Sequence, residues 1–136
     1  MSTFPLQIVT PDGAFFDGEA EKLLVRTVNG DVCILARHCD YVTALGMGEA
    51  QVFADGKKRT AACIGGMLAV TDGRVRLVPT TFEWADEIDP ERAERAAARA
   101  REILSQKKVS RQELEMARAH LNRALVRSSV AKRKGS

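Results

Sequence analysis

The sequence lacks long apolar runs and has few aromatic side chains. Of its 136 residues, only one is Trp, one Tyr and five Phe. It contains no apolar stretch of the roughly 18 residues that a membrane-spanning helix needs. The first ten residues have neither the basic start nor the apolar centre of a secretory signal. We therefore expect a soluble protein that stays in the compartment where it is made.

Cysteine and histidine are also scarce. Cys33, Cys39 and Cys63 cannot all pair within one chain, which argues against a disulfide framework and for a reducing cytoplasm. A zinc site built from these thiols and His38 is disfavoured, because there is no Cys-x-x-Cys pair and His38 adjoins Cys39. We expect no metal site and thiols that are buried or partly buried.

The length leaves room for one ordinary domain, or for a small domain with an appendage. No nucleophile, base and orienting group are clustered in the sequence, so we expect a non-catalytic protein. Charge is unevenly distributed. Residues 1–89 carry 8 Lys and Arg against 13 Asp and Glu, whereas residues 90–136 carry 13 against 5. The basic segment should face an acidic partner, which the charge alone does not identify.

The region from Phe4 to Pro79 has the pattern of an all-β domain. Phe4, Leu6 and Ile8 alternate with other residues, which places one face of the first strand in a core. Pro5 cannot donate to a strand ladder and suggests an edge position. Turn dipeptides recur at the spacing of a β-sandwich or barrel: Asp12-Gly13, Asn29-Gly30, Asp55-Gly56 and Asp72-Gly73. Asn29-Gly30 gives the strongest hairpin prediction, as a type I′ turn with positive φ at both residues.

The periodicity becomes helical after Pro79. Asp89 and Pro90 are a good cap and first residue for a helix that continues to Ser105. Ser110 and Glu113 form a capping box that starts a second helix. The predicted inner stripes consist mostly of small residues: Ala93, Ala96, Ala97, Ala100, Ile103 and Leu104 on the first helix, and Leu114, Ala117, Leu121, Ala124, Leu125 and Ser128 on the second. We predict an antiparallel αα-hairpin that is marginally stable and able to open.

Several short segments together resemble the epsilon subunits of F-type ATP synthases along nearly the whole chain. The resemblance rests on Ile8 to Gly13 followed by Phe16 to Glu21, Gly30-Asp31 with His38, Thr43 to Gly48, Ile64 to Val70, and Glu83 to Asp89 before Arg92-Ala93. Many family members carry a Gly-x-x-Gly-x-x-Pro-Gly-His string. Here Gly30, Cys33, Ala36, Arg37 and His38 occupy those positions, so the backbone of this loop is expected to differ.

The resemblance implies a fold and a set of partners. It implies a two-sheet antiparallel β-sandwich in residues 1–85, which binds the gamma subunit and the ring of c subunits, and a regulatory helical hairpin in residues 86–136. The protein would help to couple ion-driven rotation to ATP synthesis. The hairpin would inhibit ATP hydrolysis by extending into the alpha/beta hexamer. No nucleic acid is expected as a partner, and the complex alone would hold the protein at the cytoplasmic face of the bacterial cell membrane.

The resemblance also implies a nucleotide site on the folded hairpin. Some members bind regulatory ATP, with no cofactor required, through an Ile/Leu-Asp-x-x-Arg-Ala motif, which matches Ile88, Asp89, Arg92 and Ala93. Glu83, Arg123 and Arg127 match further contacts. Two interpretations stay open for these residues. Asp89 is also explained as a helix cap, and Arg123 with Arg127 as an exposed face or a contact to acidic beta subunits.

A different class of function also fits the basic hairpin. The chain could be a free-standing nucleotide sensor or a nucleic-acid binder, and co-purification would separate these functions from the rotor assignment. The lone Trp84 either anchors the linker on the sandwich or stacks on a base, and the basic residues from Arg127 to Lys134 are interpreted as a solvated chain end.

Overall fold

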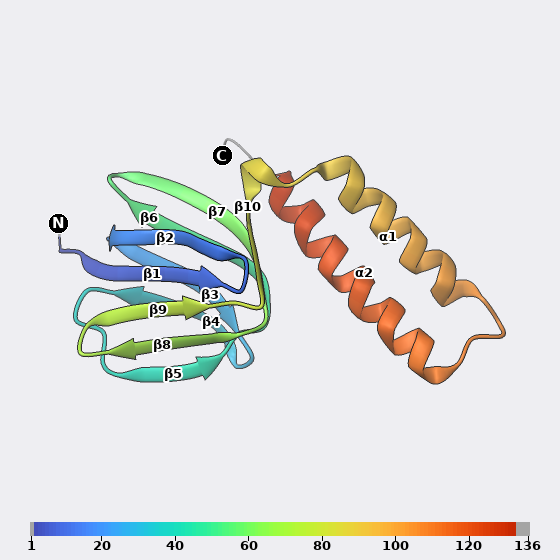
Figure 1. The fold of residues 1–136 in the computed structure, drawn as a ribbon, viewed down its shortest axis with the longest axis horizontal. Helices are drawn as coiled ribbons and strands as arrows, with labels where there is room; N and C mark the ends of the chain where they lie inside the picture. Colours follow the sequence, from blue (N-terminus) through green and yellow to red (C-terminus); the bar gives the residue numbers. More distant parts are fainter. Residues whose placement is uncertain (1, 133–136) are drawn as a thin grey trace. The chain divides into compact units, whose positions relative to one another are not determined.

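The computed structural model describes residues 2–132, which form two compact units with a boundary between Trp84 and Ala85 (Figure 1). The first unit is a sandwich of two five-stranded sheets and the second is a pair of antiparallel helices. The predicted fold class is therefore confirmed. The predicted hairpin domain runs to residue 136, and residues 133–136, with Arg133 and Lys134 of the basic chain end, lie outside the described residues.

The sandwich is built mainly from hairpins of consecutive strands. One sheet has the order β2-β1-β9-β8-β5 and the other β10-β7-β6-β3-β4. The strands are β1 Phe4–Thr10, β2 Gly13–Ala20, β3 Lys22–Thr27, β4 Gly30–Leu35, β5 Tyr41–Ala44, β6 Met47–Ala54, β7 Lys57–Ile64, β8 Met67–Thr71, β9 Arg74–Val78 and β10 Thr81–Trp84.

The first strand occupies a different place from the one predicted. β1 pairs with β2 on one side and runs parallel to β9 on the other, so it is an interior strand. Pro5 therefore does not mark an edge strand. The pairing with β9 begins only at Leu6, opposite Val75, which leaves Pro5 one residue outside that ladder and makes its missing N–H tolerable.

Alternation places the core of the sandwich as the sequence predicts. Phe4, Leu6 and Ile8 are all buried in one cluster with the inward residues of the other strands. Val75 and Leu77 on β9 are buried, whereas Arg74 and the intervening residues of that strand face outward. These strands thus contribute one apolar face each to the space between the sheets, whereas β7 is buried at every residue from Thr60 to Ile64.

Type I′ turns occur at two other hairpins. Asp55 and Gly56, between β6 and β7, both have positive φ, and so do Asp72 and the glycine that follows it. Asn29 is not among the positive-φ residues, so the predicted type I′ turn at Asn29-Gly30 is wrong. There the Thr27 hydroxyl donates to the Gly30 carbonyl and accepts from the Asn29 amide, and this local bonding holds the turn in another form.

The loop that departs from the family string has an unusual residue. Arg37 has φ +66°, a left-handed conformation that glycine adopts without strain. His38 follows it, and its Nδ1 lies 2.7 Å from the carbonyl oxygen of Cys39. The backbone thus adopts the conformation that glycine allows, although Arg37 stands where many family members have glycine. The side chain of Arg37 therefore adds strain to the loop.

Gly66 is fixed by close backbone packing, as the Gly65-Gly66 pair suggests. It has φ +95°, and a Cβ atom there would overlap the carbonyl oxygen of Val78 and lie 2.5 Å from the Cα of Pro79. These atoms are backbone and cannot rotate away, so no side chain fits.

We expect Gly66→Ala to lower the free energy of unfolding by at least about 2 kcal/mol, because backbone strain and steric overlap add. Gly73→Ala is the matched control, since Gly73 also has positive φ (+78°) but an added Cβ would meet no atom within 4 Å. The control should lose only about 1 kcal/mol. Urea unfolding followed by tryptophan fluorescence measures both, and equal losses would contradict the packing argument.

The cysteines differ in exposure from one another. Cys63 is buried, as predicted, and burial raises the pKa of its thiol to about 12. Cys33 and Cys39 are exposed, which corrects the prediction for these two. Cys33 lies on β4 beside the fully buried Ile34, and alternation along the strand turns it outward.

A thiol reagent such as DTNB at pH 8 should therefore modify two thiols rapidly in the native protein and the third only on unfolding. Cys63→Ala should leave the rapid count at two, whereas Cys33→Ala should reduce it to one. Absorbance during the reaction gives both counts. Three native thiols reacting at similar rates would show that Cys63 is accessible.

The second unit begins with the short 3-10 helix η1 Ala85–Glu87 and continues with α1 Pro90–Ser105 and α2 Arg111–Ala131. The predicted helix limits are confirmed at Pro90, Ser105 and Ser110, whose hydroxyl accepts from the Glu113 amide. No helix of residues 2–132 is both long and apolar enough to cross a bilayer.

Candidate regulatory site on the helical hairpin

The start of α1 is held by the residues of the predicted motif. Asp89 is the N-cap, and its Oδ1 accepts hydrogen bonds from the amides of Glu91 and Arg92 at 3.1 and 3.2 Å. Ile88 and Ala93 are buried on either side of this cap. The structure therefore confirms Asp89 as the helix cap, and only its other carboxylate oxygen, Oδ2, is available to a ligand.

The contact between α1 and α2 consists largely of methyl groups. The buried residues of α1 are Ala93, Ala97 and Ala100, and those of α2 include Ala117 and Ala124. Larger predicted members are only half-buried: Ile103, Leu104, Leu114 and Leu121. Small side chains allow close approach of the helices but remove little apolar area from water, roughly 0.8 kcal/mol per methyl group.

The predicted stripes are wrong at two positions. Ala96 is exposed on α1, and Leu125 on α2 is 40% exposed. Both lie at the margin of the predicted stripe. Two packed helices bury only the residues closest to the line between their axes, so the buried stripe is narrower than the apolar one. Val130 and Ala131 are buried at the end of α2, near η1 of the same unit.

One edge of the hairpin is closed by a polar contact. The Ser128 hydroxyl on α2 donates to Glu94 Oε1 on α1 at 2.7 Å, and Lys132 Nζ lies 3.8 Å from the same oxygen. The hydrogen bond from Ser128, followed by the charge of Lys132, lowers the pKa of the Glu94 carboxyl. We call this side the Glu94 edge.

The arginines lie on the opposite edge. Successive helical residues are rotated by about 100°, so Arg92 and Glu94, on either side of Ala93, point to opposite sides of the interface. On α2, Arg127 immediately precedes the buried Ser128 and points to the side of the interface away from Lys132. Arg123 is one turn before Arg127 and shares its side. The structure therefore brings Arg92, Arg123 and Arg127 to one edge, which we call the arginine edge.

The Glu94–Ser128 pair also sets the level of each arginine along the hairpin axis. Because the helices are antiparallel and Glu94 is level with Ser128, Arg92 is level with Val130. Arg127 is three residues from that level, about 4.5 Å along the axis, and Arg123 is seven residues away, about 10 Å. The guanidinium of Arg92 is exposed and has no hydrogen-bond or ion-pair partner among residues 2–132, while Arg123 Nη2 lies 3.0 Å from His120 Nδ1.

Sequence reasoning missed Arg99, which belongs to the same edge. It lies seven residues after Arg92, close to two helical turns, and at the level of Arg123 across the hairpin. It is exposed, with no partner for its guanidinium among residues 2–132. The i, i+7 spacing from Arg92 was the available signal. With it, four guanidinium groups line one edge and can bind an extended polyanion.

Glu83 is the predicted site residue that lies outside the hairpin unit. It is half-buried on β10, opposite Ala62 of β7, and its neighbours Phe82 and Trp84 point into the sandwich core. Glu83 therefore faces the other side of its sheet. Its assignment to the nucleotide site stays a prediction, as does the whole set of Glu83, Ile88, Asp89, Arg92, Ala93, Arg123 and Arg127.

Trp84 anchors the end of the sandwich. It is buried, packs edge-to-face on Phe82 with ring centroids 4.9 Å apart, and has the Arg59 guanidinium carbon 3.8 Å from its ring centroid. The ring is buried against the core and a cation lies over it, which agrees with the anchoring interpretation and not with base stacking. No group of three or more potential metal ligands occurs in residues 2–132.

The Glu94 contact should make the stability of the hairpin depend on pH. Because the pKa of Glu94 is lower in the folded state than its ordinary value of 4.5, the contact stabilises the hairpin above that pH. The stabilisation is lost as the pH falls through the folded-state pKa. Glu94→Gln keeps an acceptor oxygen but removes the charge, so it should lower the helix melting temperature at pH 7 and have a smaller effect at pH 3.

Circular dichroism at 222 nm measures these melting temperatures. Glu102→Gln is the control, because Glu102 is an exposed α1 carboxylate with no side-chain partner in the described part of the chain. Equal effects of the two substitutions, or an effect of Glu94→Gln that does not change with pH, would rule out the Glu94 contact as a determinant of hairpin stability.

Two family models together match nearly the whole chain. Residues 3–85 match the model described as "ATP synthase, Delta/Epsilon chain, beta-sandwich domain". Residues 86–132 match "ATP synthase, Delta/Epsilon chain, long alpha-helix domain".

Three curated relatives match over all or nearly all of their length. An ATP synthase epsilon chain of Ruminococcus albus is 41% identical over 135 residues, which are 98% of this chain and 100% of the relative. Another, of Shouchella clausii, is 37% identical over 136 residues, covering 100% of both chains. A third, of Caldicellulosiruptor bescii, is 37% identical and covers 96% of this chain and 95% of the relative.

Solved structures with a similar fold come from mitochondrial ATP synthases. A chain of the cryo-EM structure of the Euglena gracilis enzyme (OSCP/F1/c-ring) superposes with a TM-score of 0.79 at 23% identity, covering 90% of this chain and 77% of that one. A chain of the Tetrahymena thermophila central stalk and c-ring gives 0.68 at 10% identity, with 93% and 95% coverage. At these identities the likeness concerns the fold.

Proposed function

The chain belongs to the ATP synthase delta/epsilon family, and we propose that its helical hairpin restrains ATP hydrolysis by the synthase when ATP is scarce. In the F-type ATP synthase it is an epsilon subunit of the central stalk, and its partners are the gamma subunit, the c-ring and the alpha/beta hexamer. It makes and breaks no bond itself in this proposal. It acts through the change of the hairpin between a closed and an open form.

The methyl-rich interface of the hairpin supports this role. A helix pair joined mainly through alanines has a small free-energy difference between its closed and open forms. Opening would separate α1 from α2 and break the Glu94–Ser128 hydrogen bond. A hairpin that opened would present its basic residues to the hexamer, where we propose that it blocks rotation in the hydrolysis direction. One bound ligand suffices to change the balance of so weak a contact.

The arginine edge carries the proposal of an ATP-dependent switch. It exists only when α1 and α2 are closed, because Arg92 and Arg99 lie on one helix and Arg123 and Arg127 on the other. ATP bound across it stabilises the closed form by RT ln(1 + [ATP]/Kd), about 2.7 kcal/mol at a hundredfold excess over Kd. ATP is thus a regulatory ligand, and no cofactor is required for the stalk function.

Within this site Asp89 acts mainly through position. Its Oδ1 is engaged by the first amides of α1, so it holds the first turn and therefore Arg92 in place. Ile88 and Ala93 fix the same turn by burial. The Arg123 guanidinium is held against His120.

A free-standing nucleotide sensor or nucleic-acid binder is not favoured. The three curated relatives described above, which match this chain over nearly its whole length, are ATP synthase epsilon chains. The protein is a peripheral component of the F1 part of the complex, and we propose that it lies on the cytoplasmic face of a bacterial membrane, held there through its partners.

Calorimetric titration of the purified chain with ATP tests the nucleotide site. We expect saturable binding, with at least about a tenfold rise in Kd for Arg92→Ala, Arg99→Ala and Arg123→Ala, since each removes a charged hydrogen bond worth about 1.5–3 kcal/mol. Arg118→Ala is the matched control, because Arg118 is an exposed α2 arginine on the Glu94 edge.

The outcomes of this titration are distinct. A rise in Kd restricted to the arginine-edge variants supports the switch. An equal rise for Arg118→Ala would indicate unspecific attraction to the basic helices. No binding at millimolar ATP would remove the nucleotide site, leave the stalk assignment in place, and return these arginines to contacts with the hexamer.

A further inference from the structure

A histidine continues the arginine edge of the hairpin. His120 comes seven residues before Arg127, close to two helical turns, and three residues before Arg123, so it shares the side of α2 that carries both. It is exposed, and it lies about 4.5 Å along the axis from the level of Arg123, towards the start of α2. The row of permanent cations on this edge therefore ends in a side chain that can gain or lose its charge.

The hydrogen bond between His120 and Arg123 fixes where the imidazole proton sits. Arg123 Nη2 lies 3.0 Å from His120 Nδ1. A guanidinium only donates, so Nδ1 is the acceptor and the neutral ring carries its proton on Nε2. A doubly protonated ring has no acceptor nitrogen and repels the guanidinium. This contact therefore exists only while His120 is neutral.

The charged groups nearest to His120 on both helices are cationic. Arg99 of α1 is level with Arg123 and belongs to the same edge, and its guanidinium has no partner among residues 2–132. Arg127 is two turns further along α2, about 10 Å away. Protonation of His120 in the free chain would thus add a cation to an edge that already carries several.

No carboxylate in the described part of the hairpin stands beside the imidazole. Glu102 of α1 is level with it but comes two residues after the buried Ala100, about 200° around the helix, and so points away from α2. Glu115 is in an ion pair with Arg111, 3.4 Å away. Glu113 lies seven residues before the imidazole, about 10 Å, which exceeds the screening length of about 8 Å at physiological salt.

We propose that ATP binding at the arginine edge is coupled to the uptake of one proton from the solvent by His120. With a triphosphate on this edge, the imidazolium and the Arg123 guanidinium both donate to phosphate oxygens, so the anion offsets their repulsion. A charge-assisted hydrogen bond is also stronger than one from a neutral N–H. The coupling rests on the proposed function, because it adds a proton to the regulation of the same site.

The direction of the pH dependence follows from linkage. The complex binds more protons than the free chain does, so the affinity for ATP rises as the pH falls through the range in which histidines ordinarily change charge, about pH 5 to 8. ATP would then hold the hairpin closed at lower concentrations in more acidic solution. Glu94 stays ionised in the upper part of this range, because its pKa lies below the ordinary value of 4.5.

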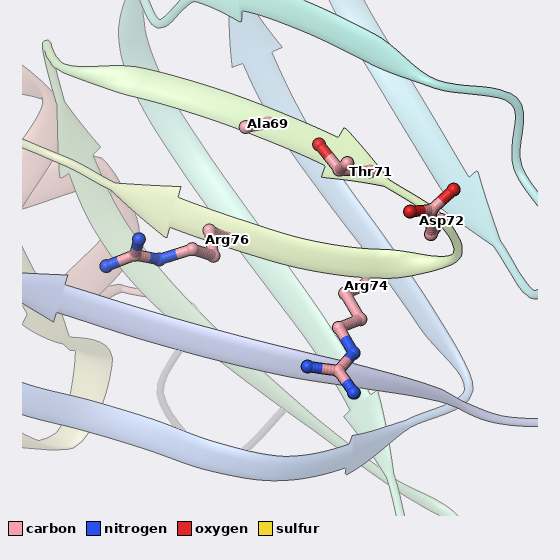
Figure 2. A pocket seen from close by; sticks show the side chains of 5 residues that line it. All are labelled: Ala69, Thr71, Asp72, Arg74 and Arg76. Atoms are coloured by element: carbon pink, nitrogen blue, oxygen red, sulfur yellow. The ribbon is translucent and has the colours of Figure 1, made fainter.

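A second pair of exposed arginines offers a competing place for the phosphates. Arg74 and Arg76 of β9 line a hollow on the outer face of their sheet, together with Ala69, Thr71 and Asp72 (Figure 2). Figure 2 shows both guanidinium groups directed away from Thr71 and Asp72. None of these five residues is a histidine, so an anion bound in the hollow gains no proton through an imidazole there.

Calorimetric titration of the purified chain with ATP at pH 6 and pH 8 tests the coupling. His120→Gln is the decisive variant, because an amide oxygen still accepts from Arg123 but the side chain does not titrate. The phosphates of ATP titrate in the same range for every chain, so the parent is compared with this variant at each pH. We expect the Kd of the parent to fall about fivefold more between pH 8 and pH 6 than that of His120→Gln.

The same titrations count the protons directly. Heats measured in buffers of different ionisation enthalpy give the number of protons taken up per ATP bound, and the parent should take up more than His120→Gln at pH 6.5. His120→Lys carries its charge at both pH values, so it should lower Kd at pH 8 and remove the additional pH dependence.

Two control variants lie in the sandwich unit. His38→Gln is the matched control, since His38 is the other of the two histidines of the chain. Arg76→Ala removes a cation from the hollow of Figure 2. Both should keep the Kd and the pH dependence of the parent. Circular dichroism at 222 nm, recorded at each pH, checks that every variant keeps its helices.

The remaining outcomes contradict the coupling in different ways. If His120→Gln weakens ATP binding equally at both pH values, His120 only positions Arg123, and the coupling is wrong while the proposed function stands. Loss of the pH dependence in His38→Gln would assign the proton to the wrong histidine. Weaker binding by Arg76→Ala would move the phosphates to the sandwich and overturn the nucleotide site on the hairpin. No binding of millimolar ATP to the parent would remove that site and the coupling together.

Discussion

The helical unit depends on the contact of alanine methyl groups between α1 and α2. Small side chains at Ala93, Ala97, Ala100, Ala117 and Ala124 bring the two backbones close together, which places Ser128 within hydrogen-bond distance of Glu94. The same approach lines up the arginines of both helices on the opposite edge. Replacing the methyl groups with larger side chains would strengthen the interface but would separate the edges. Weak packing and a composite binding edge therefore come from one choice of residue.

Most of the architecture could be predicted from periodicity and from capping chemistry. Alternation at Phe4, Leu6 and Ile8 places the sandwich core, and Asp89 with Ser110 sets both helix starts, because these signals involve only neighbours in sequence. What depended on partners distant in the chain was less accessible. The interior place of β1 needs its pairing with β9, which lies far along the chain. The turn at Asn29 was missed for a different reason, because a local bond from the Asn29 amide to the Thr27 hydroxyl competes with the usual preference of Asn-Gly.

The candidate site shows the same division. The family motif and the one-turn spacing of Arg123 and Arg127 were visible in the sequence. Their common edge with Arg92 was not, because it depends on how the two helices face each other, and this is fixed by the alanine contact together with the Glu94–Ser128 hydrogen bond, which no local pattern specifies. The i, i+7 spacing of Arg99 from Arg92 was visible, but spacing within one helix does not show that Arg99 lies at the level of Arg123 on the other. The exposure of Leu125 likewise depends on how narrow the helix contact is, and a strip of apolar residues does not report that width.

The position of Trp84 separates the two units optically. It is the single tryptophan of the chain, is buried in the sandwich core, and stands one residue before the boundary at Ala85. The only tyrosine, Tyr41, is also in the sandwich, and residues 85–132 contain no aromatic side chain except that of His120. Intrinsic emission therefore belongs to the sandwich, while nearly all helical ellipticity belongs to the hairpin. The native chain carries two label-free spectroscopic signals, so unfolding of the helical hairpin and unfolding of the sandwich can be followed separately without attaching a dye.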